Sequence, residues 1–430
     1  MAQAKRSGRS PQAQHGKKSV GSRHDRRDRL LRPNPGRQVT VRARVPLVGV
    51  IGDLVAAMAH LLDARIAFRL PILVAGAMLA SGRRTAASWF RAAGVGEDWD
   101  RFYDCLQSVG KNVRVLLLPL ASFLVKRLDP GPEGRWRIAL DDSPTRRYGR
   151  CVDVPKLQTR HAWVFRTKLE LALDLCLQVM DQLRALGSKA GFLFVFDGAY
   201  AARELVRPLL ARGATVVTRL RRNAQLFDLP VKSGRRGRPR LYGTQQLSLA
   251  KRAGRRDGWQ TIRYASRGVM VDGRCKTFLA TSHLVGGVLR VVLLEHASGN
   301  WAAYMSSDPS MSVEAILEAV SDRWAIEEQF HDVKEIWGAG EQQVRNLWSN
   351  IGCWNLCGWL YTLVELASWD QPAEQLVDRA DRPWDNPARR PSHADRRRKI
   401  AQEMLRNEFL TDLPADLNHP ELRERLLRLL

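Results

Sequence analysis

Apolar residues recur at intervals of three and four positions across residues 45–130, which is the spacing of helices that bury one face. The stretches VIGDLVAAMAHLL and LPILVAGAMLAS show this period most clearly, and in GRRTAASWFRAAGVGEDWDRFYDCL a glycine separates two amphipathic pieces. The pattern predicts a helical region, with two interpretations of its role. Two helices around a turn could form a helix-turn-helix that places Arg83, Arg84 and Arg91 on DNA, and an ordinary helical hairpin in a bundle fits equally well.

The period changes at residue 131, where short apolar runs alternate with amphipathic stretches. WRIALDD at 136–142, GFLFVFDGAY at 191–200 and ATVVTRL at 214–220 have the length and composition of buried strands. A helical pattern over 168–187 and another in AARELVRPLLARG separate them. This alternation predicts the first part of an α/β core over 131–220, with strands that are at least partly parallel.

Three further regions complete the predicted organisation. Residues 221–304 hold a Gly/Arg/Pro stretch and several short β-like runs, which predict a β-rich insertion. Residues 305–369 carry one long helical pattern over 312–338 and then a second apolar helix, which together predict the second part of the core. Residues 370–430 are polar, basic and helical in pattern.

The balance of charge indicates a partner. Lys and Arg number 69 against 44 Asp and Glu, so the formal net charge is +25. Residues 1–44 contribute thirteen basic residues against two acids, and such a segment cannot bury a core, so we expect a basic disordered tail. A chain this basic is typical of nucleic-acid-binding proteins; a solvated basic surface or a ribosome-associated tail is the alternative.

The cysteine spacing suits a reducing cytoplasm, and the hydropathy predicts no membrane-spanning helix. None of the six cysteines forms a C-x-x-C pair, and Cys353 and Cys357 lie four positions apart in an apolar helical stretch. This favours core thiols over a zinc site or a disulfide framework. The most apolar stretches, 45–62 and 351–367, are too short or too polar to span a bilayer, so no membrane partner is expected.

Two aspartates end predicted buried strands. Asp142 follows the first strand and Asp197 the second, and ligands of α/β sheets gather at the carboxyl ends of strands. Two carboxylates there could share a hard divalent cation. An aspartate after a strand is also a common turn residue or helix N-cap, and for either residue alone that interpretation is the stronger one.

Glu327 changes the balance because of its neighbours on the predicted helix. Arg323 lies four positions before it and Lys334 seven positions after it, so all three share one face. One carboxylate between two cations suits a metal-bound phosphodiester. The alternative is an intrahelical Arg–Glu pair on a solvated face, with Trp324, Ile326 and Phe330 on the buried side.

In this order, the three segments resemble the signature of DDE-type insertion-sequence transposases. ALDDSPTRRYG is similar to the first-Asp strand of that family, written D-D-T, whose second acid is taken as the catalytic one; it maps to Asp142, with Asp141 as its neighbour. FVFDGAYA is similar to the second-Asp strand and gives Asp197.

The helix segment completes the resemblance. DRWAIEEQFHDVK fits the signature Y-x2-R-x3-E-x6-K at Arg323, Glu327 and Lys334, although Val320 stands in the place of the tyrosine. The resemblance covers roughly residues 70–400, and the family's β-rich insertion between the second Asp and the Glu corresponds to 221–304.

The resemblance implies a fold and an activity. The fold class is α/β: a ribonuclease-H-like mixed sheet flanked by helices, with a β-rich insertion and helical N- and C-terminal regions. The activity is metal-dependent cleavage and strand transfer of insertion-sequence ends by cut-and-paste transposition in the bacterial nucleoid. Asp142, Asp197 and Glu327 would be catalytic and hold two Mg²⁺ or Mn²⁺ ions, while Arg323 and Lys334 would bind DNA phosphates. The implied partners are double-stranded DNA, as terminal repeats and as target, and a second copy of the chain in a synaptic homodimer.

One departure from the family concerns the segment between the two aspartates. Only 55 positions separate Asp142 from Asp197, and the helix 168–187 with its following strand takes up the later part. Little more than GRCVDVPKLQTRHAWVF remains for two strands of a ribonuclease-H-like sheet. We therefore expect a sheet truncated there, with one edge stripped beside Asp142. A catalytically inactive DNA-binding relic is the corresponding alternative.

Further features bear on DNA contacts and on rival functions. In RRGRPR at 235–240, the residues Arg235, Arg236, Arg238 and Arg240 could lie in a narrow minor groove or form a basic hairpin loop. Trp301 could stack on an unpaired base or belong to the core. Ser143 has no supporting base motif, which argues against a serine recombinase. A ribonuclease-H-like nuclease and a basic RNA-associated scaffold stay open as other functions.

Overall fold

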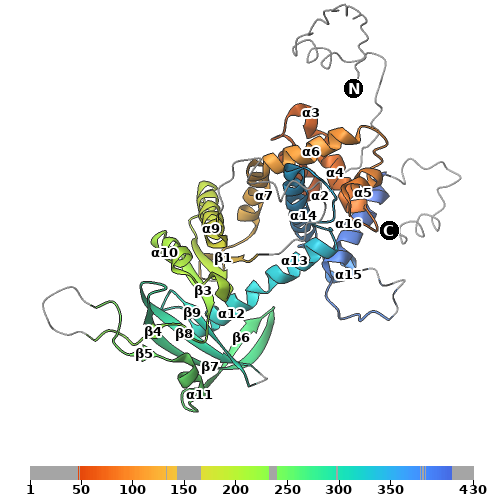
Figure 1. Cartoon of the computed structure of the whole chain (residues 1–430). Coiled ribbons are helices and arrows are strands. Elements are labelled where there is room, and N and C mark those ends of the chain that lie inside the picture. Colours follow the sequence, from red (N-terminus) through yellow and green to blue (C-terminus); the bar gives the residue numbers. More distant parts are fainter. Residues whose placement is uncertain are drawn as a thin grey trace, which may run out of the picture. The chain divides into compact units, whose positions relative to one another are not determined.

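A mixed sheet with helices on both faces, and a set of packed helices, make up the described part of the protein (Figure 1). All described residues belong to one of two units of the chain, Ala43–Leu430, the other being Met1–Arg42. The tail predicted over 1–44 therefore lies outside the described residues. In this computed structural model the described residues are 47, 49–131, 133–142, 166–231, 240–296, 299–377, 379, 382 and 384–408.

The apolar periodicity of 45–130 corresponds to a series of helices. Their apolar faces meet those of α14 (Leu347–Ala367) and α16 (His393–Glu408) in one core. α14 runs so close to the helix that ends at Lys111 that a Cβ at Gly110 would lie 1.8 Å from the Trp348 carbonyl oxygen, so glycine is required there. The helices of this region are α2 (Gly49–Ala59), α3 (Ala64–Ala67), α4 (Arg69–Leu79), α5 (Ala86–Ala92), α6 (Trp99–Lys111) and α7 (Val113–Arg127).

The turn between α4 and α5 directs one of its arginines into the protein. Arg83 and Arg91 are exposed, whereas Arg84 is half-buried and donates from Nε to the Ile336 carbonyl oxygen at 3.1 Å. Trp89 of α5 is fully buried in the helical core. These contacts favour the interpretation of a hairpin within a bundle, and DNA binding by the two exposed arginines stays a prediction.

Three parallel strands carry the predicted aspartates. β1 (Arg135–Leu140) pairs with β2 (Gly191–Phe196), and β2 pairs with β3 (Thr215–Leu220), all in parallel. The register sets the last residue of β1 beside the last residue of β2, so the chain leaves both strands at the same edge of the sheet. Parallel neighbours need crossover connections, which include α9 (Lys168–Ala185) and α10 (Arg203–Ala211).

Side chains of these strands alternate between two covered faces. On β2 the phenylalanines pack against α9 and α10, whereas Leu193 and Val195 pack against α12 (Val313–Arg323). Figure 1 shows α9 and α10 on one side of the strands and α12 on the other. Both faces of a parallel sheet are usually covered in this way, and the described fold is a mixed α/β one.

The strands predicted as an insertion over 221–304 extend the core sheet. β9 (Trp301–Ser306) pairs antiparallel with β3, β8 (Gly287–Glu295) with β9, and β7 (Val269–Ser282) with β8. The strand order is β1-β2-β3-β9-β8-β7-β4-β5, with β6 beside β7. The sheet therefore continues from the core into the insertion without a break. The remaining elements are β4 (Leu226–Phe227), β5 (Gln246–Leu247), α11 (Leu249–Gly254) and β6 (Gln260–Ser266).

β1 forms one edge of the described sheet. Its strand partner within the described residues is β2 alone. The shortening expected between Asp142 and Asp197 falls on residues 143–165, which are outside the described part of the chain. Truncation of the sheet therefore stays a prediction.

The single long helix predicted over 312–338 is in fact two helices, so that prediction is wrong. α12 ends at Arg323, and α13 (Ala325–Glu335) begins after Trp324. The Trp324 N–H bonds to the Ser321 carbonyl oxygen at 3.1 Å, a tighter turn than that of an α-helix. Packing explains the break, because α12 covers the sheet whereas Val333 near the end of α13 belongs to the helical core.

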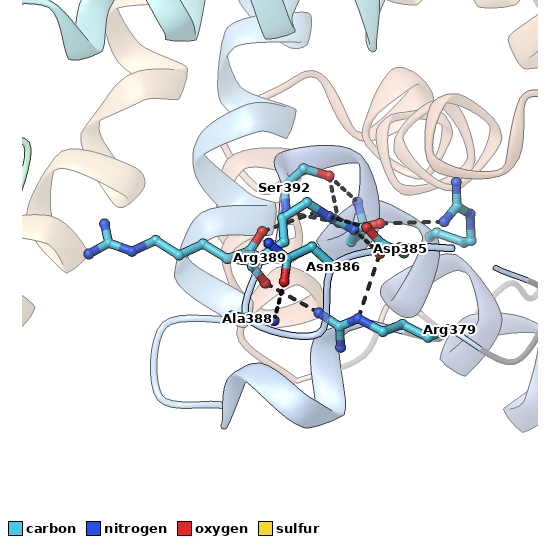
Figure 2. Close-up of polar contacts among 9 residues, drawn as sticks. Arg379, Asp385, Asn386, Ala388, Arg389 and Ser392 are labelled. Carbon is cyan, nitrogen blue, oxygen red and sulfur yellow. Dashed lines mark hydrogen bonds and ion pairs between the residues drawn. The ribbon is translucent and has the colours of Figure 1, made fainter. Parts of the chain in front are cut away.

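A network of charged groups anchors the start of α16 (Figure 2). Arg389 donates to both carboxylate oxygens of Asp385, at 2.8 and 2.9 Å, and to Asp395 at 2.7 Å. Ser392 and Asp395 exchange hydrogen bonds in the pattern of a capping box, and the Asp395 side chain is buried. These contacts fix the first turn of α16 against the segment that follows α15 (Ala373–Leu376).

The cysteines and the hydropathy of the helices agree with the sequence. Five cysteines lie within the described residues, and all five are buried free thiols, which confirms the prediction for Cys353 and Cys357. Cys151 lies outside the described part. In the ranges that the structure describes, no single helix is long and apolar enough to cross a membrane, and only α6 and α7 taken together, bent by 71°, would meet that test.

Candidate active site

The ends of β1 and β2 bring aspartates to one edge of the sheet. Asp141 and Asp142 follow β1, and Asp197 follows its parallel neighbour β2. The backbone of Asp197 stays extended, with φ −70 and ψ 158, so the alternation of β2 continues through this residue. Thr218 of β3 donates to the Asp197 carbonyl oxygen at 3.2 Å and holds this corner in place.

The paired acids after β1 make contacts on opposite faces of the sheet. Oδ2 of Asp141 lies 2.9 Å from Nη1 of Arg323, at the end of α12. Asp142 instead accepts hydrogen bonds from the Lys168 ammonium at the start of α9 and from the Tyr200 hydroxyl, the latter at 3.3 Å. Because α12 and α9 cover different faces, Asp141 is the acid on the side of the Glu327 helix.

Asp197 belongs to the same face as Asp141. Val195, two positions before it, packs against α12, and an extended chain returns to the same side every second residue. Leu140 and Phe196 are register partners, so Asp141 and Asp197 are the next pair across the two strands. The two carboxylates are therefore neighbours at the carboxyl ends of β1 and β2, on the face of the sheet that α12 covers.

Arg323 joins this pair to Glu327. Its Nη2 lies 3.0 Å from Oε1 of Glu327, while Nη1 contacts Asp141. The arginine side chain is only 12% exposed, so most of its guanidinium contacts are with protein. The end of α12 is also tied to β1, because Arg137 Nη1 lies 2.6 Å from Oδ2 of Asp322. One buried cation thus links the first strand to the glutamate of the following helix.

The solvated-face interpretation of this helix is correct in one respect and wrong in another. The Arg323–Glu327 pair that it predicts is formed. Trp324, however, is 46% exposed rather than buried, and its ring lies between the guanidinium groups of Arg267 and Arg323 at 5.6 and 5.7 Å. The break at Trp324 turns this side chain away from the core that α12 covers.

The pKa values of two groups report the charge at the sheet edge. The hydrogen bond from Lys168 lowers the pKa of Asp142. Burial raises the pKa of the Tyr200 hydroxyl, and the negative charges of Asp142, Asp141 and Asp197 raise it further. Tyr200 is therefore a hydrogen-bond donor at neutral pH and not an ionised nucleophile. All three carboxylates raise the pKa of this hydroxyl because all three lie at the carboxyl ends of β1 and β2.

The donor set suits a divalent cation in its chemistry. Within the described residues, no three His, Cys, Asp or Glu side chains are close enough together to hold a metal ion. Asp141, Asp197 and Glu327 nevertheless offer only carboxylate oxygens, the donors that Mg²⁺ and Mn²⁺ prefer. Arg323 supplies a positive charge between two of them, which is the place where a metal ion would neutralise the same oxygens.

The other predicted DNA contacts have different outcomes. Lys334 is half-buried in the last turn of α13, and Arg240 is exposed. Trp301 is half-buried against the sheet core, with the Arg222 guanidinium 5.0 Å from its ring centre, which favours the core interpretation. Arg235, Arg236 and Arg238 lie outside the described residues.

Sequence reasoning missed two residues of this site. Tyr200 and Lys168 gave no signal, because their contacts with Asp142 depend on how α9 packs on the sheet. Asp141 was named only as a neighbour of Asp142. Strand alternation places Arg137 and Asp141 on one face, but only the contacts of both with the end of α12 show which face that is.

Comparison with known proteins finds similarity to a family over part of the chain. Residues 172–363 match the family model described as the transposase DDE domain, and this range contains Asp197, Arg323 and Glu327. Asp141 and Asp142 precede it. No curated protein sequence matches the chain. The resemblance to DDE-type transposases is thereby confirmed over the matched range.

Proposed function

We propose that the chain is a DNA transposase that cuts and joins DNA by metal-dependent phosphoryl transfer, because residues 172–363 match the family model described as the transposase DDE domain. The observation that carries the proposal is the link from Asp141 through Arg323 to Glu327, beside Asp197, at one edge of the sheet. The parallel β1-β2-β3 order with helices on both faces supports a ribonuclease-H-like core.

Each acid has a role in this proposal. Asp141, Asp197 and Glu327 hold the metal ions, and Asp142 is a positioning residue. The support for choosing Asp141 over Asp142 is the face of the sheet: Asp141 reaches the arginine that also contacts Glu327, whereas the charge of Asp142 is balanced by Lys168. The sequence signature alone favoured Asp142 for this role.

The cationic side chains act on the substrate. Bound Mg²⁺ or Mn²⁺, two ions in all, supplies activation of the attacking oxygen and stabilisation of the leaving oxygen. Arg323, which balances Asp141 and Glu327 in their absence, is then free to donate to a DNA phosphate from the fork of its guanidinium. Lys334, in the last turn of α13, binds a second phosphate.

Double-stranded DNA is the proposed partner, both as terminal repeats and as target. A net charge of +25 favours binding to a polyanion, and neutralised phosphates release counterions. Joining two ends of one element needs two active sites, so the proposed assembly is a homodimer on paired ends.

The proposal predicts different outcomes for the two neighbouring acids. Asp141→Asn is expected to reduce Mn²⁺-dependent cleavage of a duplex bearing the element's own ends by about a thousand-fold, since a metal contributes several kcal/mol to the transition state. Asp142→Asn is expected to reduce cleavage by only about ten- to a hundredfold, because it changes a residue that positions the site without holding the metal. The thermal unfolding midpoint of each variant serves as the control for folding.

The same assay separates the rival functions. Joined strand-transfer product from the unaltered chain supports a transposase, and cleavage without joining indicates a ribonuclease-H-like nuclease. DNA binding without any cleavage indicates an inactive relic. A loss of cleavage in Asp142→Asn alone would return the metal-binding role to Asp142.

A further inference from the structure

A cavity of about 260 Å³ lies where α4, α13 and α16 meet, within the helical core region and apart from the sheet edge. Three arginines line it, Arg84, Arg397 and Arg398, against one acid, Glu335. The rest of its wall is backbone and small or apolar side chains at the end of α4 and along α16. A water molecule takes up roughly 30 Å³, so the cavity has room for a tetrahedral oxyanion.

Arg397 uses only part of its guanidinium in the protein. Its Nη2 donates to the carbonyl oxygens of Met78 and Ala80 at the end of α4, at 2.8 and 2.7 Å. These are terminal carbonyls that lack partners inside the helix, so this nitrogen acts as a cap. Its Nε is buried, and no described residue accepts a hydrogen bond from it.

Arg84 is placed in the same way from the other side. Its Nε donates to the carbonyl oxygen of Ile336, directly after α13, at 3.1 Å. Its Nη1 is buried and has no acceptor among the residues that the structure describes. A buried donor without an acceptor is costly, and here two such donors belong to arginines that line one cavity.

The three guanidinium groups also repel one another. Burial, followed by the neighbouring charges of Arg84 and Arg398, lowers the pKa of Arg397 to about 9. Burial likewise lowers the pKa of Arg84, and only the charge of Glu341 opposes this. Arg398 has a partial partner, since its Nη1 lies 3.5 Å from Oδ1 of Asp395. The cavity wall therefore has an excess of positive charge that an anion would relieve.

We propose that this cavity binds a phosphate oxyanion, supplied by the backbone of DNA held by the protein. The inference rests on the proposed function, because DNA is the source of the phosphate. A phosphate accepts several hydrogen bonds from guanidinium groups, so it would balance the positive charge of the three arginines that line the cavity.

The position of the cavity relates this phosphate to the cutting site. Glu327 and Ile336 are nine positions apart along α13 and its end, a rise of about 13 Å. Because Arg84 caps α13, binding at the cavity would also hold the helix that carries Glu327.

The test uses the full-length chain and a matched pair of variants. Arg398→Gln removes a charge from the cavity and leaves the two capping arginines intact. Lys399→Gln removes the same charge from the next residue of α16, which pairs with Glu403 at 3.9 Å and does not line the cavity. Arg398→Met, which keeps the aliphatic stem, replaces Arg398→Gln if that variant unfolds.

Two measurements separate the sources of phosphate. In the first, inorganic phosphate is expected to raise the thermal unfolding midpoint of the unaltered chain and of Lys399→Gln saturably, relative to chloride at equal ionic strength, and not that of Arg398→Gln. In the second, fluorescence anisotropy measures the affinity for duplex DNA at a series of salt concentrations. For Arg398→Gln, the slope of log affinity against log salt concentration is expected to be smaller in magnitude by about 0.9, which corresponds to one phosphate contact.

The outcomes are distinct. Equal behaviour of Arg398→Gln and Lys399→Gln in both measurements overturns the proposal. A lost phosphate effect with an unchanged DNA slope shows a site for free phosphate and overturns DNA as its source. If the unaltered chain does not bind DNA at all, the proposed transposase function fails, and the phosphate measurement still decides whether the cavity is an anion site.

Discussion

Replacing Glu327 with glutamine is expected to reduce Mn²⁺-dependent cleavage of DNA by about a thousand-fold. Glutamine keeps the size of the side chain and can still contact Arg323, but it lacks the negative charge that a divalent ion requires. Metal ions contribute several kcal/mol to transition states of phosphoryl transfer, and about 4 kcal/mol corresponds to three powers of ten in rate. The measurement is the initial rate of cleavage of a duplex that carries the element's own ends.

The neighbouring residue offers a matched control for this substitution. Glu328 is on the same helix, its side chain is 67% exposed, and it pairs with Arg267 at 3.5 Å. Glu328→Gln makes the same change of charge one position away and is expected to keep the rate within about threefold, as surface substitutions usually do. Equal losses in the two variants would mean that general negative charge on α13, rather than metal binding by Glu327, governs the rate.

Replacing Glu365 with alanine is expected to lower the free energy of unfolding by about 3 kcal/mol, because removing one partner strands buried charge and hydrogen-bonding groups. Oε1 of Glu365 lies 2.6 Å from Nδ1 of His393, whose side chain is only 2% exposed, and Oε2 lies 2.7 Å from Arg396. The Trp337 indole N–H donates to the other ring nitrogen of His393 at 2.9 Å. The network joins α14 to α16.

Thermal unfolding of the full chain measures this cost. Glu374→Ala is the control, because that glutamate is exposed on α15 and its loss should change stability by less than about 0.5 kcal/mol. Similar unfolding midpoints for the two variants would show that α16 is held by its other contacts, such as those of Asp395.

The same glutamate predicts how stability depends on pH. Burial alone would raise its pKa, but the hydrogen bonds and charges of His393 and Arg396 outweigh burial and lower it below the ordinary value of 4.5. A carboxylate with a depressed pKa in the folded state contributes stability that is present above pH 4.5 and is lost as the pH falls through the folded value. Glu365→Gln should therefore show a weaker loss of stability than the unaltered chain over that acidic range.

Much of the architecture followed from local pattern. Buried strands such as GFLFVFDGAY carry apolar residues on both faces because helices cover both faces. Their continuous apolar runs could therefore be predicted as strands from the sequence. The continuity of the sheet could not be predicted from the sequence, because the pairing of β3 with β9 joins residues more than 80 positions apart. Pattern identifies strands, whereas long-range pairing is decided by contacts between them.

The break between α12 and α13 shows a second limit. The apolar periodicity of 312–338 is continuous, so nothing local marks Trp324 as an interruption. The helix breaks because its two halves bury their apolar faces in different cores, one against the sheet and one among the helices. Such a break depends on where the two cores lie, and the periodicity of one segment does not predict their location.

Part of the candidate site could be predicted from local sequence. Asp197, Arg323 and Glu327 stood out by position and spacing, and the Arg323–Glu327 contact follows from their separation by one helical turn. The choice between Asp141 and Asp142 depended on which face of the sheet α12 covers. That is a matter of tertiary packing; the motif resemblance predicts Asp142, which lies on the other face, and the preference for Asp141 is part of the proposed function.

The measurement that tests the central claim most directly is Mn²⁺ binding to the full-length chain, followed by electron paramagnetic resonance, without DNA or turnover. The claim is that Asp141, Asp197 and Glu327 form one metal site. Substitution of each by its amide is predicted to weaken Mn²⁺ binding by at least about tenfold, while Asp142→Asn weakens it less than any of the three. Equal affinity in the unaltered chain and in all three site variants would contradict the account, because the ions would then be held elsewhere.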